Sequence, residues 1–398
     1  MDQHNHARHC EPVTLSGIAL ISGTAQGQLL FSRTPLSFWG GIDPQTGAII
    51  DQQHPLLAAA GILLELLLNG CNPAALVFER EETILTLGVV VAREFFGKSV
   101  PVVQLSGKGF AAIETAELKE GVAHSLSYGA ELELPDDFTL TAFDRQILAG
   151  SLGKAAEVAM RVVLQMALIQ GAQSLIDVTQ AHIDGCIYTG PASLLFAEQL
   201  CSWSAKVRVP STLNSISIDR QRWFDQGVPS SQAGPAAKLA DAYVRMGARP
   251  TYTCAPYQLS SAPAKGEQIM WAESNAVVYA NSVLGARTMK YPDFMDICVA
   301  LTGRAPNIGC HIASNRQARI KISTPPIEGA DDALFPVLGY MVGDIAANRI
   351  PIVTGLEVLA GRVSEDDLKA FGAAFATTSS APMFHIAGIT PKHRRQVI

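Results

Sequence analysis

The segment from Asp144 to Gln170 most constrains the fold, because its apolar residues recur every three or four positions and Gly171 follows it. This spacing predicts a long amphipathic helix, and glycine is common just after a helix end. Further along the chain, strand-like and helix-like segments alternate: Leu175–Val178, Pro191–Ala205, Lys206–Val209 and Pro235–Met246. Such alternation predicts a large layered α/β domain with a mainly parallel sheet.

The first part of the chain, to about residue 135, has a different pattern. Short apolar runs are broken by Gly, Pro and Asp turns, whereas Gly61–Asn69 has helical spacing and Ala75–Phe78 resembles a buried strand. This predicts a compact module of strands and flanking helices. The acidic, turn-rich stretch Glu131–Asp137 is the predicted boundary, so we expect a small domain at 1–135 and a large domain at 136–398.

Composition excludes several classes of protein. The 398 residues are 48% hydrophobic and 17% charged, which favours a folded core over disorder. The formal net charge is −6 and the Lys and Arg residues are scattered, so neither a nucleic-acid-binding stripe nor a basic membrane-binding helix is indicated. The longest apolar stretch, Leu56–Leu68, is too short to span a bilayer, and no signal-peptide pattern is present. We therefore expect a cytoplasmic protein that binds a small molecule.

Several common enzyme motifs are absent from the sequence. It contains no Gly-x-x-x-x-Gly-Lys-[Ser/Thr] phosphate loop, no Gly-x-Gly-x-x-Gly, no His-Glu-x-x-His and no Gly-x-Ser-x-Gly elbow. These absences disfavour ATP-dependent enzymes, common dinucleotide oxidoreductases, zincin proteases and α/β-hydrolases.

Three of the seven cysteines, Cys254, Cys298 and Cys310, lie in polar or irregular segments of the second part. Three thiolates that meet in space can hold a small iron–sulfur cluster and leave one iron position open for a substrate. Their spacings of 44 and 12 residues match no compact ligand motif. Buried core thiols are therefore the alternative interpretation, and spacing alone favours it.

Polar residues near the ends of predicted strands are the other candidates. His182 and Asp184 follow an apolar strand, where ligands of parallel sheets collect, although a hydrogen-bonded turn is the alternative. We predict catalytic roles for these two residues and for Lys290. A dense polar run after Trp271 suits recognition of a carboxylate, with a solvated surface as the alternative. Its substrate-binding candidates are Glu273, Ser274, Asn275, Arg287 and Thr288.

The sequence resembles one known family, aconitase X, over nearly the whole chain, and five longer strings carry most of the resemblance. They are Pro35–Gly47, Leu175–Gly185, Thr253–Tyr257, Trp271–Asn275 and Ala280–Thr288. The resemblance implies an aconitase-like large domain and a smaller N-terminal swivelling domain. It also implies an iron–sulfur hydro-lyase in which Cys254, Cys298 and Cys310 hold the cluster, of the 2Fe–2S type, as a Lewis acid.

The same resemblance implies a reaction. Members with cysteines matching Cys298 and Cys310 dehydrate cis-3-hydroxy-L-proline to Δ1-pyrroline-2-carboxylate. Archaeal relatives dehydrate mevalonate 5-phosphate and carry a Gly-Cys-Pro-His string, whereas Ser380–His385 of this chain has no cysteine. This favours the proline-derived substrate. Two alternatives stay open: a dehydratase of another hydroxy acid such as mevalonate 5-phosphate, and a non-catalytic small-molecule-binding protein of the same fold.

The sequence departs from the family at two places. Between Leu56 and Gly61 the family has a Gly- and Ser-rich loop whose serine is expected to act as the base, and this chain has only Leu-Ala-Ala-Ala there. After Pro391, the expected acidic continuation is replaced by Lys392–Arg395. The resemblance therefore identifies no residue of this chain as the catalytic base.

Overall fold

The computed structural model describes residues 17–28, 36–38, 40–51, 60–115, 123–128, 132–325, 327 and 331–391. The chain forms two compact units and passes between them several times, whereas the sequence predicted one boundary at residue 135. The smaller unit consists of Met1–Leu36, Pro73–Glu82 and Val100–Glu133, and the larger one of Ser37–Asn72, Thr83–Ser99 and Leu134–Ile398. Both departures of the sequence from the family, at 57–60 and 392–395, include residues outside the described ones.

The smaller unit contains β1 (Gly17–Ile21), β2 (Gly23–Gln28), β3 (Leu76–Phe78), β4 (Val102–Leu105), α3 (Gly107–Thr115) and β5 (Ala123–Tyr128). Strand β4 is central in a three-stranded sheet, antiparallel to β1 and parallel to β3, and β2 pairs with β5 antiparallel. Apolar residues of the central pair, such as Ile21 and Val103, are fully buried. This is the small β/α module that the sequence predicted.

The larger unit contains most of the described helices and strands. Its helices are α1 (Ala60–Asn69), α2 (Ile84–Phe96), α4 (Ala142–Leu148), α5 (Lys154–Ile169), α6 (Pro191–Ser202), α7 (Ser230–Arg245), α8 (Ser274–Tyr279), α9 (Met295–Thr302), α10 (Leu334–Ala346) and α11 (Glu365–Thr378). Its strands are β6 (Leu175–Asp177), β7 (Ala181–Ile183), β8 (Ser211–Leu213), β9 (Met270–Trp271), β10 (Arg304–Pro306), β11 (Ile320–Ser323), β12 (Pro351–Thr354) and β13 (His385–Ile386).

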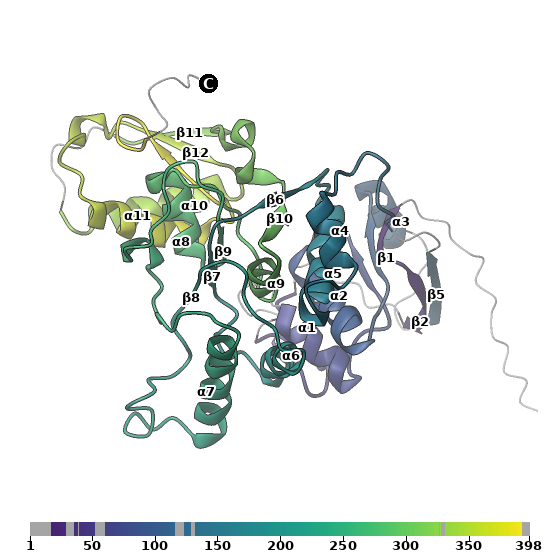
Figure 1. Cartoon of the computed structure of the whole chain (residues 1–398). Coiled ribbons are helices and arrows are strands. Elements are labelled where there is room, and N and C mark those ends of the chain that lie inside the picture. Colours follow the sequence, from purple (N-terminus) through teal and green to yellow (C-terminus); the bar gives the residue numbers. More distant parts are fainter. Residues whose placement is uncertain are drawn as a thin grey trace, which may run out of the picture. The chain divides into compact units, whose positions relative to one another are not determined.

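Two parallel sheets organise this larger unit. One has the order β8-β7-β9 and the other β11-β12-β13, while β10 and β6 form an antiparallel pair. Helix α9 packs on β7 and β9, with α5 against α9, and α10 and α11 pack together beside the second sheet (Figure 1). The buried residues Val353 and Ile386 of that sheet join Phe371 and Phe375 of α11 in one apolar core. The α/β fold class with parallel sheets is thus confirmed.

Two predicted elements differ from the structure. The single helix predicted from Asp144 to Gln170 is interrupted between α4 and α5, because Gly150 and Gly153 have φ of +79° and +86°, outside the helical region. The prediction of a strand at Lys206–Val209 is wrong, because the strand in this region is β8 (Ser211–Leu213). The backbone N–H groups of residues 207 and 208 instead donate to carbonyls at helix ends, those of Met246 and Ala300.

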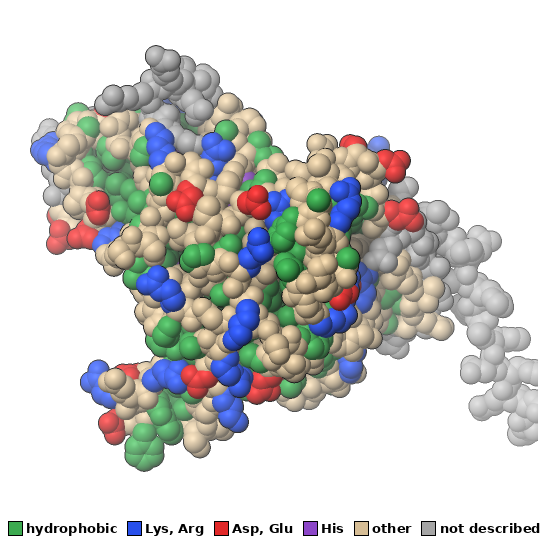
Figure 2. All heavy atoms as spheres, in the orientation of Figure 1, with side chains coloured by type: hydrophobic (Ala, Val, Ile, Leu, Met, Phe, Trp, Pro, Cys, Tyr) green, Lys and Arg blue, Asp and Glu red, His purple; other side chains and the backbone are tan. Residues whose placement is uncertain are grey.

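Charged side chains of both signs are scattered over the face of the molecule shown in Figure 2. This agrees with the scattered Lys and Arg positions in the sequence. Within the described part of the chain, no helix combines the length and the apolar character needed to cross a membrane.

Candidate active site

Polar side chains follow the parallel strands β7, β8 and β9 where these strands end. Asp184 follows β7, Asn214 follows β8, and Glu273 lies two residues after β9. Ile183 pairs in register with Leu213, so β7 and β8 end side by side. The Asn214 side-chain amide donates a hydrogen bond to the Asp184 carboxylate. This edge of the sheet is therefore a place where polar groups converge, as expected for parallel strands.

The turn that carries Asp184 is held by a buried carboxylate of helix α9. The backbone N–H groups of Asp184 and Gly185 both donate to Asp296 Oδ2, at 2.9 and 2.8 Å. A Cβ atom at Gly185 would lie 3.1 Å from the Tyr243 hydroxyl and 3.3 Å from Asp296 Oδ2, so a larger residue would crowd this turn. Burial raises the pKa of Asp184, and the Asn214 hydrogen bond opposes that shift. The Asp184 carboxyl group is thus fixed in position and is a weaker acid than an exposed aspartate.

Glu273 and Lys290 form the second part of the site. Glu273 is the N-cap of α8 and accepts a hydrogen bond from Ala276 N at 2.8 Å. Burial raises the pKa of Glu273 to about 7; Asp184 also raises it, and Lys290 opposes the shift. Burial lowers the pKa of Lys290 to about 8, opposed by the charge of Glu273, and its Nζ donates to Ser379 O at 2.8 Å. An acid and an amine near one another therefore both titrate close to neutral pH.

His182 lies inside strand β7 (Ala181–Ile183), so the prediction that it follows the end of a strand is wrong. Its Nδ1 is 2.8 Å from the Thr212 hydroxyl, and its Nε2 has no hydrogen-bond partner of normal geometry among the described residues. Burial lowers the pKa of His182 to about 3, although the backbone of Thr253 opposes the shift. The imidazole is therefore neutral at physiological pH, packed edge-on beside Trp271, and its predicted catalytic role stays a prediction.

The other members of the polar run have different surroundings. Ser274 is exposed on the first turn of α8, and Asn275 Oδ1 is buried with no hydrogen-bond partner among the described residues. The buried Thr288 hydroxyl accepts from Trp271 N at 3.2 Å, which is a structural contact. Half-buried Arg287 donates to a backbone carbonyl, that of residue 311, at 3.4 Å. Their substrate-binding roles stay predictions.

The three predicted ligand cysteines lie in three different environments. Cys254 is exposed, with its Sγ 3.1 Å from the Ser215 hydroxyl. Cys298 is fully buried in α9, where burial and then the charge of Asp296 raise its thiol pKa. Cys310 is buried in a short 3-10 turn (Gly309–His311). Cys254 alone of the three is exposed at the surface.

Three family models match this chain in sequence order. The model described as "Aconitase X swivel domain" matches residues 14–59 and 57–124, "Aconitase X first domain" matches 137–314, and "Aconitase X second domain" matches 317–397. The chain belongs to the aconitase X family. The swivel match consists of two segments that meet at 57–59, where this aconitase X chain departs from the family in sequence.

Named relatives of this aconitase X chain include two dehydratases. A cis-3-hydroxy-L-proline dehydratase of Hypocrea jecorina is 53% identical over 94% of this chain and 69% of its own length. One of Pseudomonas aeruginosa is 50% identical with the same coverage of both chains. The crystal structure of holo-form aconitase X of Thermococcus kodakaraensis is 32% identical, with a TM-score of 0.58 over 65% of this chain and 64% of that one.

An iron–sulfur cluster needs thiolates that converge on it. Among residues 17–391 that the structure describes, no group of three His, Cys, Asp or Glu side chains is placed so that it could hold a metal ion. Cys254, Cys298 and Cys310 of this aconitase X chain thus do not form a ligand set in this conformation. The assignment of these three cysteines as cluster ligands stays a prediction.

Sequence reasoning missed three residues that shape the aconitase X site. Asn214 was missed because the strand before it was placed too early, at Lys206–Val209. Asp296 and Tyr243 lie in helices, and their relation to the β7 turn depends on contacts between segments far apart in sequence. The string Asp293-Phe-Met-Asp296 was the available signal, since two acids at the start of an apolar helix are unusual for a buried segment.

Proposed function

We propose that this aconitase X chain is a hydro-lyase that removes water from cis-3-hydroxy-L-proline to give Δ1-pyrroline-2-carboxylate. The observation that carries the proposal is the Glu273–Lys290 pair beside Asp184, with pKa values of about 7 and 8. Dehydration needs one group that accepts a proton and one that donates a proton, and both work best when their pKa lies near the working pH. The 53% and 50% identity to cis-3-hydroxy-L-proline dehydratases supports the choice of substrate.

In the proposed reaction, the Glu273 carboxylate accepts the proton from the ring carbon that bears the substrate carboxylate. The electrons of that C–H bond form a C=C bond as the neighbouring C–O bond breaks, and Lys290 donates a proton so that the hydroxyl leaves as water. The resulting enamine tautomerises to the cyclic imine. Asp184 lies near enough to affect the pKa of Glu273, and in this proposal its carboxylate meets the ring nitrogen. Arg287 remains our candidate for the substrate carboxylate.

This assignment changes three roles from the sequence-based prediction. Asp184, predicted to be catalytic, instead binds the ring nitrogen. Glu273, predicted to bind substrate, becomes the proton acceptor, because its capping bond to Ala276 N fixes the carboxylate. His182 takes no part in the proposed proton transfers, because a buried imidazole with a pKa of about 3 does not readily accept a proton at neutral pH.

The expected cofactor is an iron–sulfur cluster, of the 2Fe–2S type. A bound iron would supply Lewis acidity toward the leaving hydroxyl, but we assign no step to it because the three cysteines do not converge. After anaerobic reconstitution with iron and sulfide, we expect bound iron and visible absorption in the wild type, and loss of both in Cys254→Ser, Cys298→Ser and Cys310→Ser. Cys201→Ser, half-buried on α6, is the matched control. Iron retained by all three variants would refute the ligand assignment.

The substrate proposal predicts a sharp selectivity among hydroxyproline isomers. We expect turnover of cis-3-hydroxy-L-proline and none of the 4-hydroxy isomers, whose hydroxyl is not on the carbon next to the acidified one. Product formation followed by NMR measures this directly. Comparable turnover of mevalonate 5-phosphate would favour the other dehydratase activity, and saturable binding of 3-hydroxyproline without turnover would favour a binding protein.

A further inference from the structure

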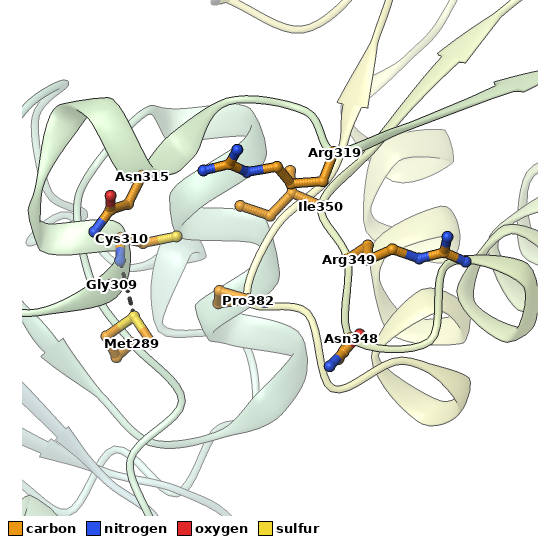
Figure 3. Close-up of a pocket in the computed structure, with 9 residues that line it drawn as sticks. All are labelled: Met289, Gly309, Cys310, Asn315, Arg319, Asn348, Arg349, Ile350 and Pro382. Atoms are coloured by element: carbon orange, nitrogen blue, oxygen red, sulfur yellow. Dashed lines mark hydrogen bonds between the residues drawn. The ribbon is translucent and has the colours of Figure 1, made fainter. Parts of the chain in front are cut away.

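Figure 3 shows a hollow beside Cys310, which belongs to the candidate site because Cys310 is a predicted cluster ligand. A different hollow, of about 270 Å³, lies on helix α7 and the turn before it, and we call it the α7 hollow. None of the catalytic, substrate-binding or cysteine candidates lines it. Its lining residues are Ile218, Arg220, Trp223, Ala233, Gly234 and Ala237.

The walls of the α7 hollow are apolar and its floor is open. Ile218 and Ala233 belong to a small apolar cluster of the larger unit, and Trp223 and Ala237 pack against that cluster. A Cβ atom built on Gly234 would meet nothing within 4 Å beyond its own helix turn. Apolar surface that is left in contact with water costs free energy. The α7 hollow is therefore suited to an apolar group that fills it.

The size and polarity of the α7 hollow favour a single side chain over a charged small molecule. Its volume lies below the range of about 300–1,000 Å³ for small-molecule sites, whereas an apolar cavity of about 150 Å³ accepts a benzene ring. The guanidinium of Arg220 is already paired, with Asp241 Oδ1 at 2.8 Å and the Tyr252 hydroxyl at 3.1 Å. One aromatic ring would fit the hollow without needing that cation.

An aromatic ring of this kind is exposed beside the hollow. Phe224 is 78% exposed and does not line the hollow, although its ring centroid lies 5.9 Å from that of Trp223, which does. The turn that carries Phe224 is ordered, because Gly227 N donates to Phe224 O and Val228 N to Trp223 O, both at 3.0 Å. A ring held on an ordered turn loses little conformational entropy when it binds.

The ring and the hollow have opposite charges next to them. Asp225 follows Phe224, whereas Lys238 lies one helical turn after Gly234 on α7. Asp225 and Lys238 are both exposed, and neither forms an ion pair with any residue that the structure describes. Figure 2 shows hydrophobic side chains together with charged ones of both signs where α7 and the turn before it lie. This patch thus carries both halves of a complementary contact.

We propose that the α7 hollow binds the Phe224 ring of a second copy of this chain, and that the hollow of the second copy binds the Phe224 ring of the first. Ring and hollow lie in one patch, so a two-fold axis through the patch forms both contacts at once. Each insertion brings Asp225 of one copy to Lys238 of the other, which compensates both charges. A partner with a different surface would need to supply both a ring and a hollow.

Sedimentation velocity of the full chain at micromolar concentrations tests this dimer. We expect a reversible dimer of the wild type. Phe224→Ser is expected to raise the dimer Kd by at least about a hundredfold, since each dimer loses two buried aromatic rings. Val358→Ser is the matched control: Val358 is 63% exposed but lies outside the patch. This control should leave the Kd unchanged within about twofold.

Filling the α7 hollow tests its side of the contact. Gly234→Leu places a side chain where the ring would bind, and we expect it to weaken the dimer as much as Phe224→Ser does. Leucine is a better helix former than glycine, so α7 should remain folded, which circular dichroism checks. Gly234→Ala makes the same kind of backbone change with a single methyl group and should weaken the dimer much less.

A charge exchange identifies the occupant as a second copy. Asp225→Lys and Lys238→Asp, each alone, should raise the dimer Kd by at least about tenfold, because both contacts then join like charges. An equimolar mixture of the two variants should dimerise again, since both contacts in the mixed dimer join opposite charges. A monomeric wild type, a dimer that survives both Phe224→Ser and Gly234→Leu, or a mixture that stays monomeric would overturn the proposal. None of these outcomes depends on dehydratase activity.

Discussion

Glu273→Gln is expected to lower kcat/KM for cis-3-hydroxy-L-proline by about a hundred- to ten-thousandfold, the usual contribution of a positioned acid or base. Glutamine can still accept the capping hydrogen bond from Ala276 N, so α8 should keep its N-terminus. What it cannot do is accept the substrate proton. Steady-state kinetics with the purified variant measures the effect.

Glu267→Gln is the matched control for this substitution. Glu267 precedes β9, at the opposite end of the strand from Glu273, and contacts the Thr179 hydroxyl. Its pKa is lowered by hydrogen bonds from Thr179, Ala264 and Gln180, which outweigh burial, so it is an ionised structural carboxylate. We expect near-normal turnover in Glu267→Gln. Equal losses in the two glutamine variants would mean that Glu273 acts only through the fold.

The pH profile gives an independent readout of the same pair. Glu273 must be ionised to accept a proton, so activity should rise as the pH increases through about 7; Lys290 must be protonated, so activity should fall above about 8. The profile of kcat/KM is therefore expected to be bell-shaped. Lys290→Met should remove the alkaline limb and move the acidic limb to higher pH, because the cation that opposes the rise in the pKa of Glu273 is gone. An unchanged acidic limb would contradict the proposed coupling.

The sequence predicted those parts of the fold that depend on local spacing. Helices α5, α6 and α7 have apolar residues at helical intervals, and Gly171 follows α5 with φ +69°, as the pattern indicated. The strand at Lys206–Val209 was wrong because strands are defined by their partners. Only residues 211–213 pair with β7, and apolar spacing over four residues cannot distinguish the two segments.

In the candidate site too, the sequence predicted the residues that have a local signal and missed those that depend on distant segments. Asp184 was found because polar residues after apolar strands are a local signal, and Glu273 because it belongs to a dense polar run after Trp271. The sequence did not reveal the surroundings that set the protonation of these carboxylates, because those surroundings come from distant segments. Asp296 lies 112 residues from Asp184, and the pKa of Lys290 is lowered by burial alone. The cysteine assignment came from family resemblance, and no group of three metal-binding side chains among the described residues is placed so that it could hold a metal ion.

A buried ion pair joins Arg304 of β10 to Asp144 of α4, and the larger unit should be sensitive to the loss of one of its two charges. The Arg304 side chain is 4% exposed and that of Asp144 fully buried; Nε donates to Oδ1 at 2.7 Å and Nη2 to Oδ2 at 3.1 Å. Asp144 Oδ2 also accepts from Thr141 N at 2.8 Å, closing the capping box of α4. Every strong partner of the Asp144 carboxylate is thus within the protein. Loss of the guanidinium would leave a negative charge buried without water or a counter-ion.

Arg304→Met is therefore expected to lower the free energy of unfolding by about 3–5 kcal/mol, the range for breaking a buried pair on one side. Urea unfolding followed by tryptophan fluorescence measures it. Asp177→Asn is the control, because Asp177 accepts from Arg304 Nη1 at 2.8 Å but has an 85% exposed side chain, so its loss should be small. The double variant Asp144→Leu/Arg304→Met has neither charge, so part of the lost free energy of unfolding should return. The recovery should be incomplete, because Asp144→Leu also removes the capping box of α4. If that double variant is no more stable than Arg304→Met alone, the cost arises from lost packing of the arginine side chain instead of an unpaired charge.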